Sequence, residues 1–137
     1  MSVACERGRV VHMSLAVSGG LYLAALASPA LVWHPGFLGG AKSGAVCLAL
    51  GWTTVGRLVP AWLANPVLAL AVLCLTLERA TAALTLALVA LGLGLTTFRL
   101  YQVDPDFAHP HIGCYLWLAS MLAVAVGAAA RVARSER

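Results

Sequence analysis

The chain has 137 residues, of which 61% are apolar and only 10% are charged, and its formal net charge is +4. A soluble domain carries about 25% charged residues, so this composition argues against a water-soluble globular protein and predicts that lipid is the solvent. The basic residues stand singly between apolar runs, without the basic stripe that follows a phosphate backbone. We therefore expect the lipid bilayer, and no nucleic acid, as a partner.

The first apolar run covers residues 10–33 and follows Arg7 and Arg9. Its length suits a transmembrane helix, since about 20 apolar residues cross the hydrocarbon core. A secretory signal has the same layout, and residues 25–27 (Ala-Leu-Ala) would suit its cleavage site. Because the rest of the chain is equally apolar, we expect an uncleaved first span. A start at Met13 would remove both arginines.

The second apolar run is too short for an ordinary crossing. A Pro and Gly loop after Trp33 separates it from the first run. It covers residues 43–56, and at 1.5 Å per residue it reaches about 21 Å of the roughly 30 Å core. The stretch LVPAWLANP then breaks the helix. We predict that residues 43–62 form a re-entrant segment or a short span, and that residues 66–78 form a further short span.

Two more spans are predicted, over residues 80–101 and 112–130. Glu78 and Arg79 lie directly before the first of these. Charged residues inside a bilayer are costly and often functional, but the polar apex of a helical hairpin is the simpler interpretation. The predicted fold is an all-α membrane bundle in one domain, with four transmembrane helices and one re-entrant or half-span segment. The alternative has five transmembrane helices.

The distribution of basic residues favours four crossings. Cytoplasmic loops carry an excess of Lys and Arg. With five crossings the two sides hold four and five basic residues, whereas with four crossings they hold six and three. The richer side then contains Arg7, Arg9, Arg79, Arg131, Arg134 and Arg137. We therefore expect a multi-pass protein with both termini in the cytoplasm.

Three more polar residues lie within or beside the apolar runs, namely Arg57, Asn65 and Arg99. Arg57 and Asn65 flank a break in helix, and broken helices at membrane depth line the binding sites of many transporters. Alternatively, Arg57 and Arg99 extend their long side chains to the membrane surface. No Ser lies in a G-x-S-x-G context, and no other catalytic constellation is present. We expect that the protein is not an enzyme.

The connection before the last span is rich in groups that bind metals. Asp104, Asp106, His109, His111 and Cys114 fall within eleven positions. Imidazole is the commonest ligand of transition metals. A proline after the first histidine favours an extended backbone there, which would let both rings reach one ion. An aspartate would then complete a site for Zn²⁺ or Cu²⁺.

An ordinary connection explains the same residues. A link between two spans must be polar and must break helix, and Asp-Pro and His-Pro do both. Asp also caps free N–H groups in turns. Cys114 is expected within the last helix, where it can face lipid. Cys47 and Cys74 lie inside apolar runs and are interpreted as small apolar residues. No cofactor is expected unless the metal hypothesis holds.

Three short motifs carry a resemblance. They are Gly51-Trp52, AWLANP at residues 61–66 and GCYLWLAS at residues 113–120. Together they resemble a loose group of small bacterial polytopic inner-membrane proteins of unassigned function. In that group the last span often opens with Gly-Tyr-Tyr-Leu-Trp-Leu, and here Cys114 replaces the first tyrosine. The resemblance covers residues 43–125 and implies a location in the bacterial inner membrane, but no activity.

Three functions remain open. The first is a non-enzymatic accessory or interaction protein, for example of the immunity type, that packs against another membrane protein or itself. The second is a small-solute or ion transporter or channel built as a homo-oligomer, which requires a continuous polar cavity reaching Arg57 or Glu78. The third is metal binding through residues 104–111. The absence of a catalytic pattern favours the first.

Overall fold

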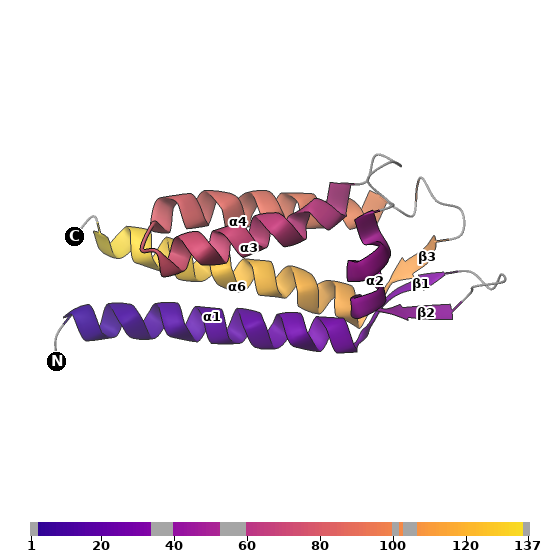
Figure 1. The fold of residues 1–137 in the computed structure, drawn as a ribbon, viewed down its shortest axis with the longest axis horizontal. Coiled ribbons are helices and arrows are strands. Elements are labelled where there is room, and N and C mark those ends of the chain that lie inside the picture. The colour runs from indigo at the N-terminus through magenta and orange to yellow at the C-terminus, as the bar shows by residue number, and fades with distance from the viewer. Residues whose placement is uncertain (1–2, 34–39, 53–59, 100–101, 103–106, 136–137) are drawn as a thin grey trace.

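The computed structural model describes residues 3–33, 40–52, 60–99, 102 and 107–135 (Figure 1). Four helices run along its long axis, and neighbours in the sequence point in opposite directions. Helix α6 packs against α1 on one side and α4 on the other, and α3 packs against α4. The helices are α1 (Val3–Ala27), α3 (Ala64–Thr76), α4 (Ala80–Leu95) and α6 (Ile112–Ser135).

The short elements gather at one end of the bundle, which we call the sheet end. Strands β1 (Pro29–Trp33), β2 (Gly40–Ser43) and β3 (Phe107–Pro110) form an antiparallel sheet of order β2-β1-β3. Helix α2 (Gly44–Leu50) and the 3₁₀ turns η2 (Pro60–Leu63) and η3 (Thr96–Arg99) lie beside it. Figure 1 shows both chain termini and the α3–α4 turn at the opposite end, which we call the turn end.

The prediction of one helix over residues 10–33 is wrong at its C-terminal end. Helix α1 ends at Ala27, and the next residues form β1. Pro29 explains the boundary, since proline has no N–H to donate and disfavours helix at the residue before it. A proline is tolerated as the first residue of a strand. The all-α prediction thus missed a small sheet.

Helix α2 is the described part of the predicted 43–62 segment. The hydroxyl of Ser43 accepts a hydrogen bond from the N–H of Val46 and caps the helix. Seven residues give α2 a length of only about 10 Å, and it lies across the end of the bundle (Figure 1). Gly44 fits against the backbone of Ala25, where a Cβ would overlap. A re-entrant path is not seen in the described residues, and Arg57 lies outside them.

Helices of membrane length are present in the part of the chain that the structure describes. Three are long and apolar enough to cross a bilayer, at Arg9–Ala27, Ala80–Arg99 and Ile112–Ser135. The apolar helical segment Pro60–Thr76 is shorter. The predicted helical bundle is therefore confirmed, and these elements are compatible with a membrane protein.

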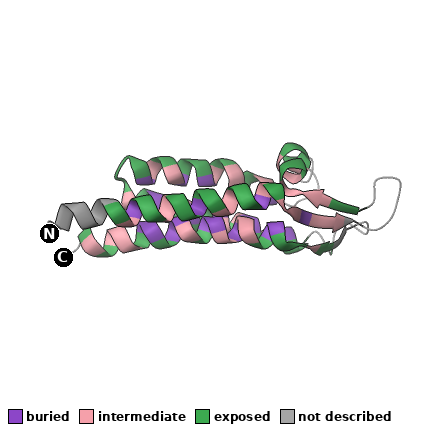
Figure 2. Ribbon diagram, turned by 90° about the horizontal axis from the view of Figure 1, so that it is seen from below, coloured by how far each residue is buried: buried purple, intermediate pink, exposed green. Residues whose placement is uncertain are grey.

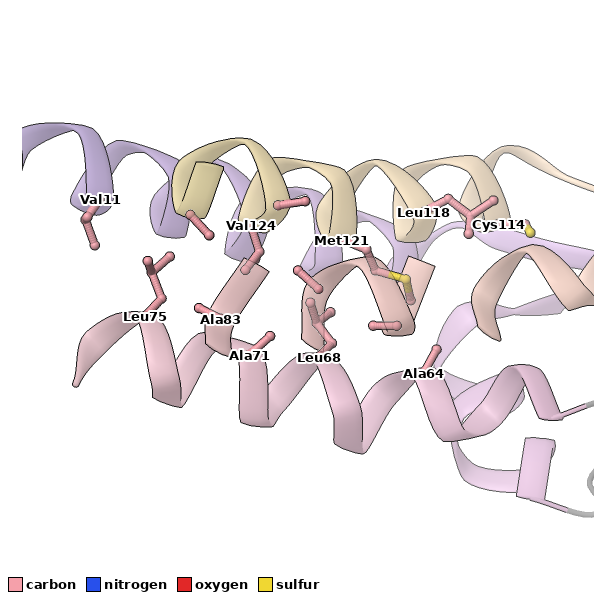
Figure 3. Packing of buried hydrophobic residues seen from close by; sticks show 14 residues of the cluster. Val11, Ala64, Leu68, Ala71, Leu75, Ala83, Cys114, Leu118, Met121 and Val124 are labelled. Carbon is pink, nitrogen blue, oxygen red and sulfur yellow. The ribbon is translucent and has the colours of Figure 1, made fainter. Parts of the chain in front are cut away.

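Small side chains form the seam between the helices (Figure 3). Buried positions recur at intervals of three and four residues, which is the spacing of a packed helix seam. Many of these positions hold alanine or glycine, so the backbones can approach closely, as in membrane bundles. The repeats are Ala64, Leu68, Ala71 and Leu75 in α3, and Ala83, Ala87, Ala90 and Gly94 in α4.

Large apolar side chains lie on the outside of the bundle. Leu23 is 68% exposed, Leu77 59% and Val126 60%, and Figure 2 shows exposed residues along the outer faces of the helices. Soluble monomers rarely expose large contiguous apolar patches. A chain that buries alanine and exposes leucine has the surface that lipid tails solvate, so the outer face fits the membrane location predicted from composition.

Candidate functional site

A cavity of about 310 Å³ lies at the sheet end of the bundle. Residues of α1, β1, β2, α2, η2, α3, η3 and α6 line it. It therefore forms where the small sheet and α2 close over the ends of the long helices. Because these elements are far apart in the sequence, only the tertiary fold creates this hollow.

Asn65 organises the cavity. Its side-chain oxygen Oδ1 accepts two hydrogen bonds, from the hydroxyl of Tyr22 and from the indole Nε1–H of Trp117, each at 2.9 Å. Its amide Nδ2 donates to the carbonyl of Trp62 at 3.1 Å. One side chain in the first turn of α3 thus connects α1, η2 and α6. These partly buried polar groups therefore pair largely with one another.

Trp62 holds α2 in place over the cavity. Its indole Nε1–H donates to the carbonyl of Leu48 at 2.7 Å. Gly51, just after α2, lies against the indole ring, because a Cβ there would be 2.8 Å from its Cδ1 atom. The sequence predicts only a helix break with an aromatic anchor for residues 61–66. The structure shows that this tryptophan joins the break to α2.

The lining is mostly apolar, with one positive charge. Lys42 is the only charged residue among the residues that line the cavity in the described structure. Cys47 of α2 and Cys114 of α6 also line it. Burial raises the pKa of the Cys47 thiol, and the charge of Lys42 partly opposes this. Cys114 is only 3% exposed, so the expectation that it faces lipid is wrong.

The turn end contains a separate polar group. The turn between α3 and α4 includes Glu78 and Arg79, as the hairpin prediction requires, and both side chains are exposed. Arg131 pairs with Glu78 at 2.9 Å and donates to the carbonyl of Leu75 at 3.3 Å. Between this group and the cavity lies the apolar cluster that includes Leu68 and Leu75 (Figure 3).

The histidine pair lies at the rim of the sheet. The ring centroids of His109 and His111 are 6.4 Å apart, and both residues are exposed. His109 is in β3, so the predicted extended backbone is confirmed. In the described parts of the chain no three His, Cys, Asp or Glu side chains group around one point. Asp104 and Asp106 fall outside those parts, so the metal site stays a prediction.

The remaining polar residues are dispersed. Arg99 ends η3 and is exposed. Of the predicted polar residues that the structure describes, Asn65 alone lines the cavity. Its partners Tyr22 and Trp117, and the lining residue Lys42, are not among the residues predicted for the site. The residue types of Tyr22 and Trp117 could have indicated their role, since buried Tyr and Trp usually need a hydrogen-bond partner.

Comparisons of the chain with protein-family models, with curated proteins and with solved structures found no match. The site is therefore interpreted from its own geometry.

Proposed function

We propose that this chain is a small multi-pass protein of the bacterial inner membrane that acts by binding, without catalysis, as an accessory protein to a membrane-embedded partner. The partner is a lipid, another membrane protein or a second copy of the chain. The observation that carries this proposal is a mostly apolar cavity at the sheet end of an apolar bundle, with an apolar cluster between it and the turn end. The outer faces of the helices are apolar as well, which suits a partner that is embedded in the bilayer.

The proposed topology has four crossings, by α1, by η2 with α3, by α4 with η3, and by α6. The segment Pro60–Thr76 has 17 residues, about 25 Å of helix, which is at the short end of what spans a bilayer. The shared position of both termini and the α3–α4 turn supports an even number of crossings. The excess of basic residues at that end supports a cytoplasmic location for it, and α2 then lies at the outer membrane surface.

Binding is favoured over transport because of the apolar cluster between the two ends. A transporter needs a polar path that reaches both sides of the membrane. In the described residues, the cavity reaches Asn65, and the interior beyond it consists of side chains such as Leu68, Leu75 and Val124. A single copy of the chain would therefore present its cavity to one side only.

Labelling with a membrane-impermeant maleimide tests the topology. Single cysteines replace Ala41, Gln102, Arg79 and Ser135 in a background without the four native cysteines. We expect the cysteines at 41 and 102 to react in intact spheroplasts, and those at 79 and 135 only after permeabilisation. The opposite pattern would refute the proposed orientation.

The same reagent separates binding from transport. A variant that keeps only Cys47 is labelled in right-side-out and in inside-out vesicles, with a Ser135→Cys variant as the control for inside access. We expect Cys47 to react from the outer side alone. Labelling from both sides would show that the cavity alternates between the two faces, and the transport hypothesis would replace this proposal.

A further inference from the structure

We infer that the cavity binds a single-tailed anionic amphiphile, with its head group at Lys42 and its tail between Trp62 and Trp117. This inference rests on the proposed function and specifies the ligand of the same site. It is derived from the volume of the cavity, the chemistry of its lining and the position of Lys42, the charged residue among its described lining residues.

The volume suits a medium-length tail. An engineered apolar cavity of about 150 Å³ binds benzene. The cavity described above has about 310 Å³, so by proportion it holds roughly twelve non-hydrogen atoms. A full two-chain phospholipid is too large to be enclosed, whereas one alkyl tail of about ten carbons fits.

The lining suits an alkyl tail. Leu26, Leu31 and Leu48 contribute apolar surface from three different elements, and the indoles of Trp62 and Trp117 contribute two more apolar faces. Binding sites of this kind are mostly apolar, with a few polar groups that set the orientation of the ligand. Here both indole N–H groups are already bonded to Leu48 and Asn65, so the rings offer their faces to the ligand.

The charge suits an anionic head group. Lys42 is half-buried and lines the cavity. Among the residues that the structure describes, no carboxylate pairs with it. A charge beside an apolar cavity attracts an anion more strongly than a fully solvated one does, because the surrounding dielectric constant is lower. An anion with an apolar tail would therefore bind both the charge and the apolar lining. Lys42 sits on β2, directly opposite Leu31 of β1, which places the head group at the sheet.

The polar group of Asn65 adds a second point of recognition. The Nδ2 atom of Asn65 carries two N–H groups, and only one hydrogen bond from it, to Trp62, is made within the described residues. The remaining N–H can donate to an oxygen of the ligand. A tail that carries a hydroxyl or carbonyl group would therefore bind more tightly than a plain alkyl tail.

Quenching of tryptophan fluorescence tests the inference. The protein is purified in an uncharged detergent with Trp33 and Trp52 replaced by phenylalanine, so that Trp62 and Trp117 report. We expect 10-bromodecanoate to quench saturably and unlabelled decanoate to compete. The alcohol 10-bromodecanol should bind at least tenfold more weakly. Decyl phosphate serves as a second competitor. If it competes at a lower concentration than decanoate, the site prefers a phosphate head group, as in a phospholipid-derived ligand. If decanoate competes at the lower concentration, the site prefers a fatty acid.

Matched variants locate the binding. Lys42→Gln should weaken decanoate binding at least tenfold, while Arg99→Gln, which removes an exposed cation at the same end, should change it less than twofold. Cys47→Phe fills the cavity and should abolish saturable quenching, while Ala49→Phe on the exposed face of α2 should not. Circular dichroism confirms that each variant is folded.

Non-saturable quenching, or equal binding of the acid and the alcohol, would overturn the inference, because both indicate partition into the micelle. The inference would also be overturned if Lys42→Gln and Cys47→Phe left decanoate binding unchanged. The measurement does not depend on orientation in the membrane. Labelling of Cys47 from both sides of the membrane would refute the proposed function yet leave amphiphile binding intact, whereas failed binding in a protein whose Cys47 reacts from the outer side alone would refute only this inference.

Discussion

Asn65 lies in a hydrogen-bonded environment that its neighbours in the sequence do not indicate. In the sequence it lies between two prolines, at a break in an apolar region. In the fold it forms hydrogen bonds with the Tyr22 hydroxyl, the Trp117 indole and the Trp62 carbonyl. A buried donor that loses its acceptor costs about 1–3 kcal/mol. The stability of the sheet end therefore depends on this one amide.

Replacing Asn65 by leucine should lower the free energy of unfolding by about 2 kcal/mol or more, because two donors lose their acceptor. Tyr22→Phe removes one donor and leaves no group unpaired, so it should cost about 1 kcal/mol. Thermal unfolding in detergent, followed by circular dichroism, compares the two. Equal melting temperatures for both variants and the parent would show that the network does not stabilise the fold.

Cys47 should react slowly with maleimide at neutral pH. Burial raises its pKa and Lys42 partly opposes this, so the thiolate is scarce until the pH exceeds the usual range for a thiol, about 8.5. The rate of alkylation should keep rising above that pH. Lys42→Gln removes the opposing charge and should slow the reaction further at any pH below the pKa. A profile that levels off near 8.5 in both proteins would contradict the expected environment of Cys47.

At the scale of elements, small residues decide how closely the helices pack. Gly127 of α6 faces Ser14 of α1, and a Cβ on Gly127 would overlap the Ser14 side chain. Gly20 of α1 has nothing within 4 Å of its own Cβ position. The two glycines thus differ in packing, although both lie in apolar helices.

Gly127→Val should destabilise the contact between α1 and α6 by about 1–3 kcal/mol, the usual cost of overpacking. Gly20→Val places the same side chain on an open surface and should change the stability little. Guanidinium or SDS titration of the two variants measures the difference. Equal stability changes in the two variants would mean that the contact between Gly127 and α1 does not set the cost.

The α3–α4 turn depends on a left-handed residue. Glu78 has a φ of 65°, a conformation that costs roughly 1 kcal/mol for a residue with a Cβ. Its ion pair with Arg131 contributes little, since the Glu78 side chain is 79% exposed. We therefore expect substitutions at Glu78 to change the stability mainly through the backbone conformation, and less through the loss of the ion pair.

Glu78→Gly should be more stable than Glu78→Ala by about 1 kcal/mol, because both lose the carboxylate and only glycine adopts this φ without strain. Glycine ordinarily lowers stability relative to alanine, since its unfolded chain has more freedom. Chemical denaturation of both variants gives the comparison. If alanine is the more stable of the two, the turn does not hold residue 78 in the left-handed region.

At the scale of the whole molecule, charge and apolar surface act together. The apolar outer faces of the bundle contact lipid equally well in both orientations of the protein in the membrane, so they do not determine which end is cytoplasmic. The six basic residues assigned to the turn end and the three assigned to the sheet end make that distinction in the proposed topology.

Changing Arg79, Arg134 and Arg137 to glutamine while adding Ala41→Arg and Gln102→Arg reverses that bias. We expect a mixed or inverted orientation, measured with a C-terminal reporter that is active on only one side of the membrane. A control with Arg134→Lys keeps the charge and should keep the orientation. An unchanged orientation in the charge-reversed variant would show that these residues do not set the topology.

The amino-acid sequence alone predicts a bundle of apolar helices, because composition and the length of apolar runs depend directly on the solvent that surrounds a helix. It also located the α3–α4 hairpin, since two adjacent charges between apolar runs mark a turn. The end of α1 was predictable in principle from Pro29, but the preference of the next residues for strand depended on β2 and β3 as partners.

The candidate site, in contrast, depends on the tertiary structure. Tyr22, Lys42, Asn65 and Trp117 are far apart in the sequence, and no local pattern states which of them meet. Periodicity gives the buried face of each helix but not the neighbour that covers it. The cavity arises because the sheet and α2 pack across the helix ends, so its volume and the position of Lys42 in its lining are properties of the packed chain.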